Sequence, residues 1–223
     1  MPSTRLVDAT VADGIATVRL NRPEKLNAVT LESLAKLRDA LVGLSENAEG
    51  DEAIGGLVVA GAGDVTCAGM DRDVVADPDY DEKYGDDVAR LTSEVYDFLT
   101  SRPYPTVVAA RGALIGIGFI LSLRCDFLVL GEETTLSLPE VQFGIAATHT
   151  IPHLEAVVGT RVATEIALAG EPIPPVRALE LGLANRVVPN DEVEEAATEL
   201  VETIAAHDAH VVRELKAATS SPE

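Results

Sequence analysis

The stretch Val107–Asp126, VVAARGALIGIGFILSLRCD, contains the pattern that decides the fold. The apolar run Thr106–Ala110 predicts a buried strand, and the closely spaced glycines after it predict a sharp turn into a short helix over Gly116–Leu123. A similar order occurs about 50 residues earlier, in Val58–Asp71, VVAGAGDVTCAGMD, which we interpret as a weak internal repeat. Buried strands that alternate with helices indicate an α/β fold.

The rest of the chain continues this alternation. Residues Thr4–Ala9 and Ile15–Leu20 alternate apolar and polar positions around Asp13-Gly14, which predicts a hairpin. The acidic segment Asp71–Gly85 is expected to be a mobile loop. Further strands are expected at Leu57–Ala60, Phe127–Leu130, Thr134–Leu138 and Asn185–Val188, and further helices at Thr30–Leu44, Val88–Leu99, 139–143, 150–158, 160–169, 175–181, 193–204 and 209–218.

Length and composition limit the class of protein. The chain has 223 residues, 47% of them hydrophobic, which suits one domain with a substantial core. No apolar run approaches the ~20 residues that span a bilayer, and the first residues lack the order of a signal peptide. We therefore expect a cytoplasmic protein that does not enter a membrane. Cys67 and Cys125 are the only cysteines, too few for a disulfide framework or a zinc ribbon.

The chain is strongly acidic, with a net charge of −20 from 17 basic and 37 acidic residues. This charge disfavours binding to nucleic acid and to anionic membranes, because both require clustered positive charge. Two explanations fit the excess of acid. It keeps the surface soluble by self-repulsion, or it adapts the protein to high salt, where charges are screened over a few ångströms. We favour the second, halophilic, explanation.

Several familiar sites are disfavoured. Gly61-Ala62-Gly63 follows a predicted strand, but Thr66 stands where a dinucleotide-binding turn has its third glycine. His149 and His153 have the spacing of zinc ligands on a helix, but Pro152 lies between them and no third ligand is evident, so no metal site is expected. Cys125-Asp126 is interpreted as a packed thiol beside a buried, hydrogen-bonded carboxylate.

The two glycine turns remain as candidates for chemistry. Helix starts expose unpaired backbone N–H groups, and two starts that face one another can hold an oxyanion. In Ala68-Gly69-Met70-Asp71 the available donor is the Met70 N–H, and in Gly116-Ile117-Gly118 it is the Ile117 N–H. Glu140, at another helix start, can move a proton. The alternative is that the glycines only permit tight turns.

Five ordered motifs between Thr10 and Ile204 resemble those of the crotonase superfamily, the enoyl-CoA hydratase/isomerase proteins. They are NRPEKLNA (21–28), VVAGAGDVTCAGMD, ARGALIGIGFILSLRCD, LPEVQFGI (138–145) and ALELGLANRVVP (178–189). The resemblance implies a spiral of ββα units over residues 1–190. Residues 191–223 would form a C-terminal helical segment that is short for the family. It also implies a homotrimer or hexamer that acts on an acyl-CoA thioester, without a separate cofactor.

The resemblance assigns roles to particular residues. The enolate of the thioester would be held between the N–H groups of Met70 and Ile117, with Gly116 before the second donor. The segments around residues 21–28 and after Met70 would border the nucleotide. The expected cations there are Arg22, Lys25 and Arg72, and the other expected contacts are the backbone groups of Leu26, Ala28 and Ala68 and the neighbouring Gly69 and Asp71.

One departure from the family pattern indicates the reaction. Hydratases of the family carry two glutamates, and here Ile120 occupies the first position while Glu140 occupies the second. One carboxylate in an apolar pocket suits proton transfer from C2 to C4 better than addition of water, and the run Glu140–Ile145 resembles that of single-glutamate 3,2-enoyl-CoA isomerases. We expect an isomerase. Hydration of 2-enoyl-CoA, and a non-catalytic CoA-binding subunit, are the alternatives.

Overall fold

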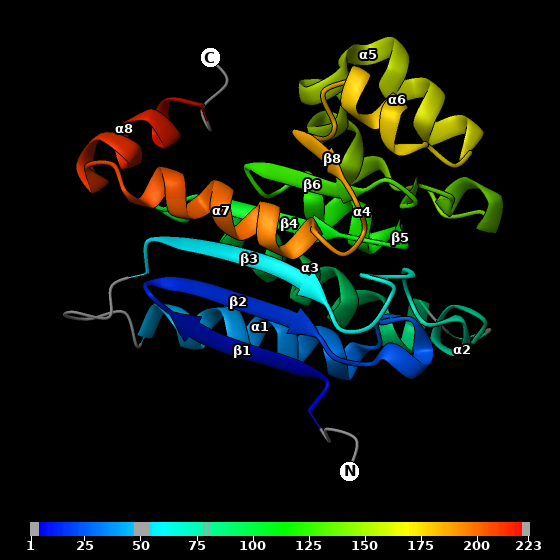
Figure 1. The fold of residues 1–223 in the computed structure, drawn as a ribbon. Coiled ribbons are helices and arrows are strands. Elements are labelled where there is room, and N and C mark those ends of the chain that lie inside the picture. Colours follow the sequence, from blue (N-terminus) through cyan, green and yellow to red (C-terminus); the bar gives the residue numbers. More distant parts are fainter. Residues whose placement is uncertain (1–4, 47–53, 78, 80, 220–223) are drawn as a thin grey trace.

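The computed structural model describes residues 5–46, 54–77, 79 and 81–219. Its centre is a six-stranded sheet of order β1-β2-β3-β4-β6-β8, in which only the β1–β2 pair is antiparallel (Figure 1). The strands of this sheet are β1 (Val7–Ala12), β2 (Ile15–Leu20), β3 (Gly56–Gly61), β4 (Thr106–Ala110), β6 (Phe127–Gly131) and β8 (Arg186–Val188). A small second sheet pairs β5 (Ala113–Ile115) with β7 (Thr135–Ser137).

Each strand of the small sheet directly follows a strand of the large one. Strand β5 follows β4 and leads into a helix, and β7 follows β6 and leads into a helical turn, so the chain repeats a ββα unit. The predicted α/β fold built from such units is confirmed. The helices are α1 (Leu31–Glu46), α2 (Arg72–Val75), α3 (Asp86–Thr100), α4 (Ile117–Ser122), α5 (Ile151–Ala169), α6 (Pro175–Glu180), α7 (Val193–Ala205) and α8 (Ala209–Thr219).

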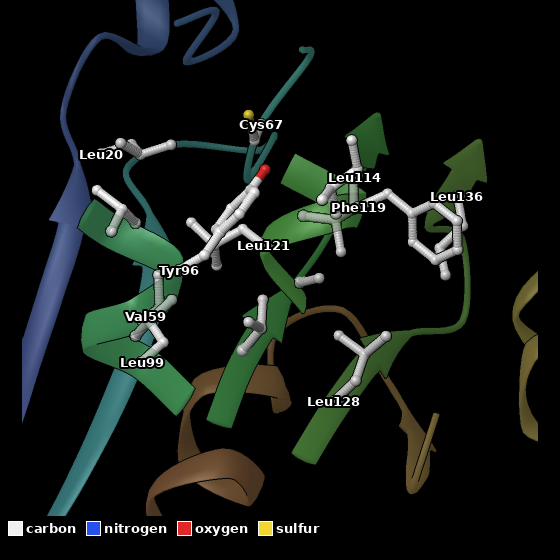
Figure 2. Close-up of a cluster of buried hydrophobic side chains, with 14 of the residues drawn as sticks. Leu20, Val59, Cys67, Tyr96, Leu99, Leu114, Phe119, Leu121, Leu128 and Leu136 are labelled. Atoms are coloured by element: carbon white, nitrogen blue, oxygen red, sulfur yellow. The ribbon is translucent and has the colours of Figure 1, made fainter. Parts of the chain in front are cut away.

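Both faces of the large sheet are covered over β3, β4 and β6, which explains the unbroken apolar sequence of these strands. Successive strand residues point to opposite faces. Val59 therefore packs with α1, α3 and α4, whereas Val58 packs with the buried face of α7, including Val201. Figure 2 shows part of the larger cluster, where Tyr96 of α3 lies beside Leu121 of α4. No helix in the described ranges is long and apolar enough to cross a membrane.

The hairpin forms, but its first strand was predicted too early. Strand β1 runs over Val7–Ala12 and pairs Val7 with Leu20. The turn Asp13-Gly14 has φ of 50° and 76°, as a two-residue hairpin turn requires, and strands must extend to the turn itself. Most of β1 is exposed, so its apolar pattern is a weak guide to its limits. Thr4 lies outside the described residues.

The prediction that Asp71–Gly85 is a loop is wrong, because the segment contains helical structure. It contains α2, whose start is capped by the Asp71 side chain accepting a hydrogen bond from the Asp73 N–H at 3.0 Å. A π-helical turn over Asp81–Gly85 then leads into α3. The expected pair of helices over 150–158 and 160–169 is confirmed, because α5 is broken at Gly159, where φ is 74° and ψ is 161°.

The C-terminal helix α8 is fastened to the start of β4. Lys216 Nζ donates to Asp126 Oδ2 at 2.6 Å and to Tyr104 O at 2.7 Å, and Asp126 also accepts from the Thr106 N–H at 2.7 Å. Asp126 is thus hydrogen-bonded as predicted, but the residue is exposed rather than buried. The Cys125 thiol is packed, and burial raises its pKa to about 12.

Candidate active site

The segment that carries Met70 is fixed from both sides. Toward β5, the Cys67 N–H donates to Ala113 O at 3.0 Å. On the other side, the Val29 N–H donates to Gly69 O and the Asp71 N–H donates to Val29 O, both at 2.8 Å. Since the groups flanking it face Val29, the Met70 N–H points the opposite way. It has no acceptor among the described residues.

The second glycine turn opens α4. Gly116 has φ of 53° and ψ of −117°, a conformation that strongly favours glycine, and its N–H donates to Ser137 O at 2.9 Å. The next N–H, that of Ile117, is in the first turn of the helix, where no intrahelical acceptor exists. Within the described ranges it too has no acceptor.

Glu140 lies against this helix start. It begins the 3₁₀ turn Glu140–Phe143 that follows β7. A Cβ built on Gly116 would stand 2.8 Å from Glu140 Oε1 and 4.0 Å from the Gly69 Cα, so both glycine turns and the carboxylate meet at one place. Glu140 Oε2 is buried and has no hydrogen-bond partner among the described residues. Burial raises the pKa of Glu140, although its own backbone N–H partly opposes this.

These groups line a cavity of about 850 Å³. That volume is in the range of pockets for small molecules and cofactors. The predicted site residues in its wall are Ala68, Gly69, Met70, Arg72, Gly116, Ile117 and Glu140. Ile120, which occupies the position of the first glutamate of the family pattern, is also in the wall. The predicted residues Arg22, Lys25, Leu26, Ala28 and Asp71 are not.

Arg22 is engaged within the chain. Its Nη1 donates to Asp71 Oδ2 at 2.6 Å and to Ala28 O at 3.1 Å. This hydrogen bond is the main reason that the pKa of Asp71 is lowered. The pair therefore fastens the 21–28 loop to the start of α2, and Arg22 is less available to a phosphate than the sequence suggests.

The other predicted nucleotide contacts differ in availability. Lys25 Nζ is 3.6 Å from Asp73 Oδ2 on the surface, next to the exposed Arg72. The Leu26 carbonyl accepts from the Ala68 N–H at 3.1 Å, and the Ala28 N–H donates to Lys25 O at 3.0 Å. These backbone groups are thus paired internally. The Ala68 carbonyl receives no hydrogen bond from the described part of the chain.

Sequence reasoning missed Asn27 and three side chains in the cavity wall. Asn27 is buried, and its Nδ2 donates to Ala62 O at 2.8 Å and to Val65 O at 2.6 Å, which ties the 21–28 loop to the segment between β3 and the first glycine turn. Its φ of 54° lies in the left-handed region, which asparagine adopts more readily than most residues. The position of Asn27 in the NRPEKLNA motif was the sequence signal that could have pointed to this role. The other missed residues are Thr92, Tyr96 and Arg124. His149, considered from the sequence only as a zinc ligand, also lines the cavity.

Comparison with known proteins identifies the family of the chain. The family model described as enoyl-CoA hydratase/isomerase matches residues 10–222. A hydroxycinnamoyl-CoA hydratase-lyase of Pseudomonas fluorescens is 32% identical over 95% of this chain and 77% of its own length. A putative enoyl-CoA hydratase of Thermus thermophilus is 32% identical, over 86% of this chain and 74% of its own length.

Solved structures give the same result. The enoyl-CoA hydratase of Mycobacterium smegmatis superposes with a TM-score of 0.86 at 27% identity, covering 96% of this chain and 81% of its own. A putative enoyl-CoA hydratase of Thermobifida fusca, solved in complex with CoA, superposes with a TM-score of 0.82 at 25% identity, covering 95% and 83%. These relatives are named hydratases, and none of these names supports the isomerase subgroup. The chain belongs to the enoyl-CoA hydratase/isomerase family.

Proposed function

We propose that this chain forms the enolate of an acyl-CoA thioester. The thioester oxygen accepts hydrogen bonds from the N–H groups of Met70 and Ile117, and Glu140 transfers the proton at C2. The observation that carries the proposal is the Glu140 carboxylate against Gly116, with a buried Oε2 that has no partner, beside two N–H groups without acceptors among the described residues. A donor aimed at the developing oxyanion contributes ~10²–10³ in rate.

The reaction that this arrangement suits best is migration of a double bond. In a 3-enoyl-CoA, the Glu140 carboxylate takes the C2 proton, and the electron pair of the C–H bond enters the conjugated dienolate. The charge collects on the thioester oxygen between the two N–H groups. Glu140 then returns the proton to C4, which gives the 2-enoyl-CoA. The raised pKa of Glu140 helps it to act first as a base and then as an acid.

Ile120 supports this choice. It lines the cavity at the position where the family resemblance expects a second carboxylate, and its side chain cannot orient or deprotonate water. Glu140 alone can therefore take the proton from C2 and return it to C4, whereas a water molecule would have one fewer group to activate it. We propose isomerisation as the first candidate reaction.

Hydration of a 2-enoyl-CoA is the second candidate. The names of the relatives support it more directly than isomerisation, since the relatives described above are named hydratases. Both reactions use the same thioester site and the same Glu140. They differ in whether water attacks C3.

For the CoA portion, we propose Arg72 and Lys25 as the phosphate-binding cations. Arg72 lines the cavity, and Lys25 pairs with Asp73 beside it at a solvent-exposed position. The Ala68 carbonyl, which accepts no hydrogen bond from the described residues, is the proposed acceptor for an amide of the pantetheine arm. The CoA bound to the Thermobifida fusca protein supports a CoA ligand for the family.

The test compares two substrates in parallel. Wild-type protein and Glu140→Gln are assayed for double-bond migration in 3-hexenoyl-CoA and for water addition to crotonyl-CoA. Glu199→Gln, which changes an exposed glutamate of α7, is the matched control. We expect wild type and Glu199→Gln to convert 3-hexenoyl-CoA, and Glu140→Gln to lose at least 10³-fold in kcat. Faster conversion of crotonyl-CoA would favour hydration, and full activity in Glu140→Gln would overturn both candidates.

A further inference from the structure

The wall of the cavity formed by α3 and the end of α4 carries a cationic side chain that the proposed reaction does not use. Arg124 follows α4 and lines the cavity together with Thr92 and Tyr96 of α3. The chain has 17 basic residues against 37 acidic ones, so arginines have many possible carboxylate partners. Arg22, Arg38, Arg90 and Arg111 all form ion pairs.

Arg124 forms no ion pair within the described ranges. Its guanidinium carbon lies 5.0 Å from the centre of the Tyr96 ring, and its Nε is buried without a hydrogen-bond partner. Burial lowers the pKa of Arg124, but a guanidinium remains charged in proteins. A partly buried charge without a partner is costly, which indicates that a group absent from the chain itself completes the site.

Two further polar atoms in the same wall are unsatisfied. Tyr96 is 4% exposed, and neither its hydroxyl nor the Thr92 hydroxyl has a partner among the described residues. Burial raises the pKa of Tyr96, so the hydroxyl stays protonated and can donate. Figure 2 shows the Tyr96 ring extending from α3 toward Cys67, which precedes the first glycine turn.

The titratable groups around Arg124 form no direct ion pair with it among the described residues. Burial and the charge of Arg124 lower the pKa of both His149 and His153, so both imidazoles are neutral near pH 7. Asp97 also faces the cavity, but it is exposed and forms no ion pair with Arg124. A ligand carboxylate would supply both the missing charge and the missing acceptors.

We propose that Arg124 and the Tyr96 hydroxyl bind a carboxylate at the far end of the acyl group, so that the substrate is the CoA thioester of a short dicarboxylic acid. The Arg124 guanidinium lies against the Tyr96 ring, and both residues line the same cavity as Glu140. The proton-transferring group and the cation therefore face a single cavity of about 850 Å³, which favours a short acyl chain. This inference rests on the proposed function.

The experiment compares thioesters of similar length that differ in terminal charge, in the same two assays. The pair for double-bond migration is 3-hexenedioyl-CoA and 3-hexenoyl-CoA, and the pair for water addition is glutaconyl-CoA and crotonyl-CoA. In the assay where wild type is active, we expect a kcat/KM at least 10-fold higher for the thioester with the terminal carboxylate. Arg124→Met should reduce that preference by about 10- to 100-fold, the effect of a charge-assisted hydrogen bond, through KM and with little change for the uncharged thioester. Arg161→Met changes an exposed arginine of α5 outside the cavity wall and should leave the preference unchanged.

A second variant guards against misfolding. Tyr96→Phe removes a buried hydroxyl without a partner, so it should melt at the same temperature as wild type or higher while losing part of the carboxylate preference. Equal use of both thioesters by wild type would overturn the inference while leaving the proposed function intact. The inference would also be overturned if Arg124→Met lost affinity for free CoA by as large a factor as it lost the preference for the carboxylate, because the arginine would then bind the nucleotide. Turnover of no thioester would instead refute the proposed function.

Discussion

Replacing Gly116 by alanine tests the contact between the start of α4 and Glu140. The new Cβ would stand 2.8 Å from Glu140 Oε1, well inside ordinary van der Waals contact, so the carboxylate would have to retreat by several tenths of an ångström. The backbone of Gly116, at φ of 53° and ψ of −117°, is also unfavourable for a residue with a side chain. The strain should cost ~1–3 kcal/mol of stability.

The effect on catalysis should exceed the effect on folding. Displacement of a reacting group by about 1 Å can cost 10²-fold in rate, so the smaller displacement here should lower kcat by about 10- to 100-fold. A loss of ~1–3 kcal/mol should lower Tm by roughly 2–12 °C in a chain of this size. The assay is turnover of the better thioester substrate at a temperature where both proteins are folded, with Tm measured by circular dichroism.

Gly182→Ala is the matched control. Gly182 also has a positive φ, 76°, but a Cβ there meets nothing within 4 Å, and the residue is not in the cavity wall. This variant should lose stability and keep its activity. If Gly116→Ala turned over substrate as fast as Gly182→Ala, Glu140 would not work from the position against Gly116, and the catalytic geometry proposed above would be refuted.

Three further predictions concern acidity, docking and assembly. Because the pKa of Glu140 is raised in the folded protein, ionisation of this carboxyl lowers the stability of the fold as pH rises. Glu140→Gln should therefore have a higher urea midpoint than wild type at pH 8 and the same midpoint below pH 4. An equal increase in the midpoint at both pH values would contradict this explanation. Asp126→Ala removes the acceptor shared by β4 and Lys216, and should cost about 1–3 kcal/mol in urea unfolding; an unchanged midpoint would show that α8 is held otherwise. Leu168 and Val176 are 69% and 66% exposed, so light scattering in KCl should detect the predicted trimer or hexamer. The urea midpoint should rise with the KCl concentration, because salt screens the repulsion between acidic side chains. A monomer whose urea midpoint does not change with salt would contradict both the oligomer and the adaptation to high salt.

The fold was predictable where apolar runs are long and both sheet faces are covered. Val58 and Val59 lie in such a run, and the buried strand expected there is present as β3. The limits of β1 were not predictable from the same signal, because an edge strand exposes most of its side chains and its alternation is weak. The helix α2 was missed because its stability comes from a single cap, Asp71, rather than from an apolar stripe.

The candidate site was predictable where backbone conformation dictates the residue. Gly69 and Gly116 have positive φ, which favours glycine, so the two turns could be recognised from the glycines in the sequence. Glu140 could be recognised from its place in a motif. The position of Arg124 beside Tyr96 was not visible, because their contact depends on how α3 packs against α4. The availability of Arg22 was misjudged for the same reason, since its partner Asp71 lies in a distant segment.

The most direct test of enolate formation is exchange of the C2 protons of a saturated thioester, butyryl-CoA, in D₂O, followed by proton NMR. This exchange needs only the N–H groups of Met70 and Ile117 and the carboxylate of Glu140, and it is independent of whether the later step is isomerisation or hydration. We expect exchange catalysed by wild type and by Glu199→Gln, and a loss of at least 10³-fold in Glu140→Gln. Undiminished exchange in Glu140→Gln, or none in wild type that binds the thioester, would contradict the account.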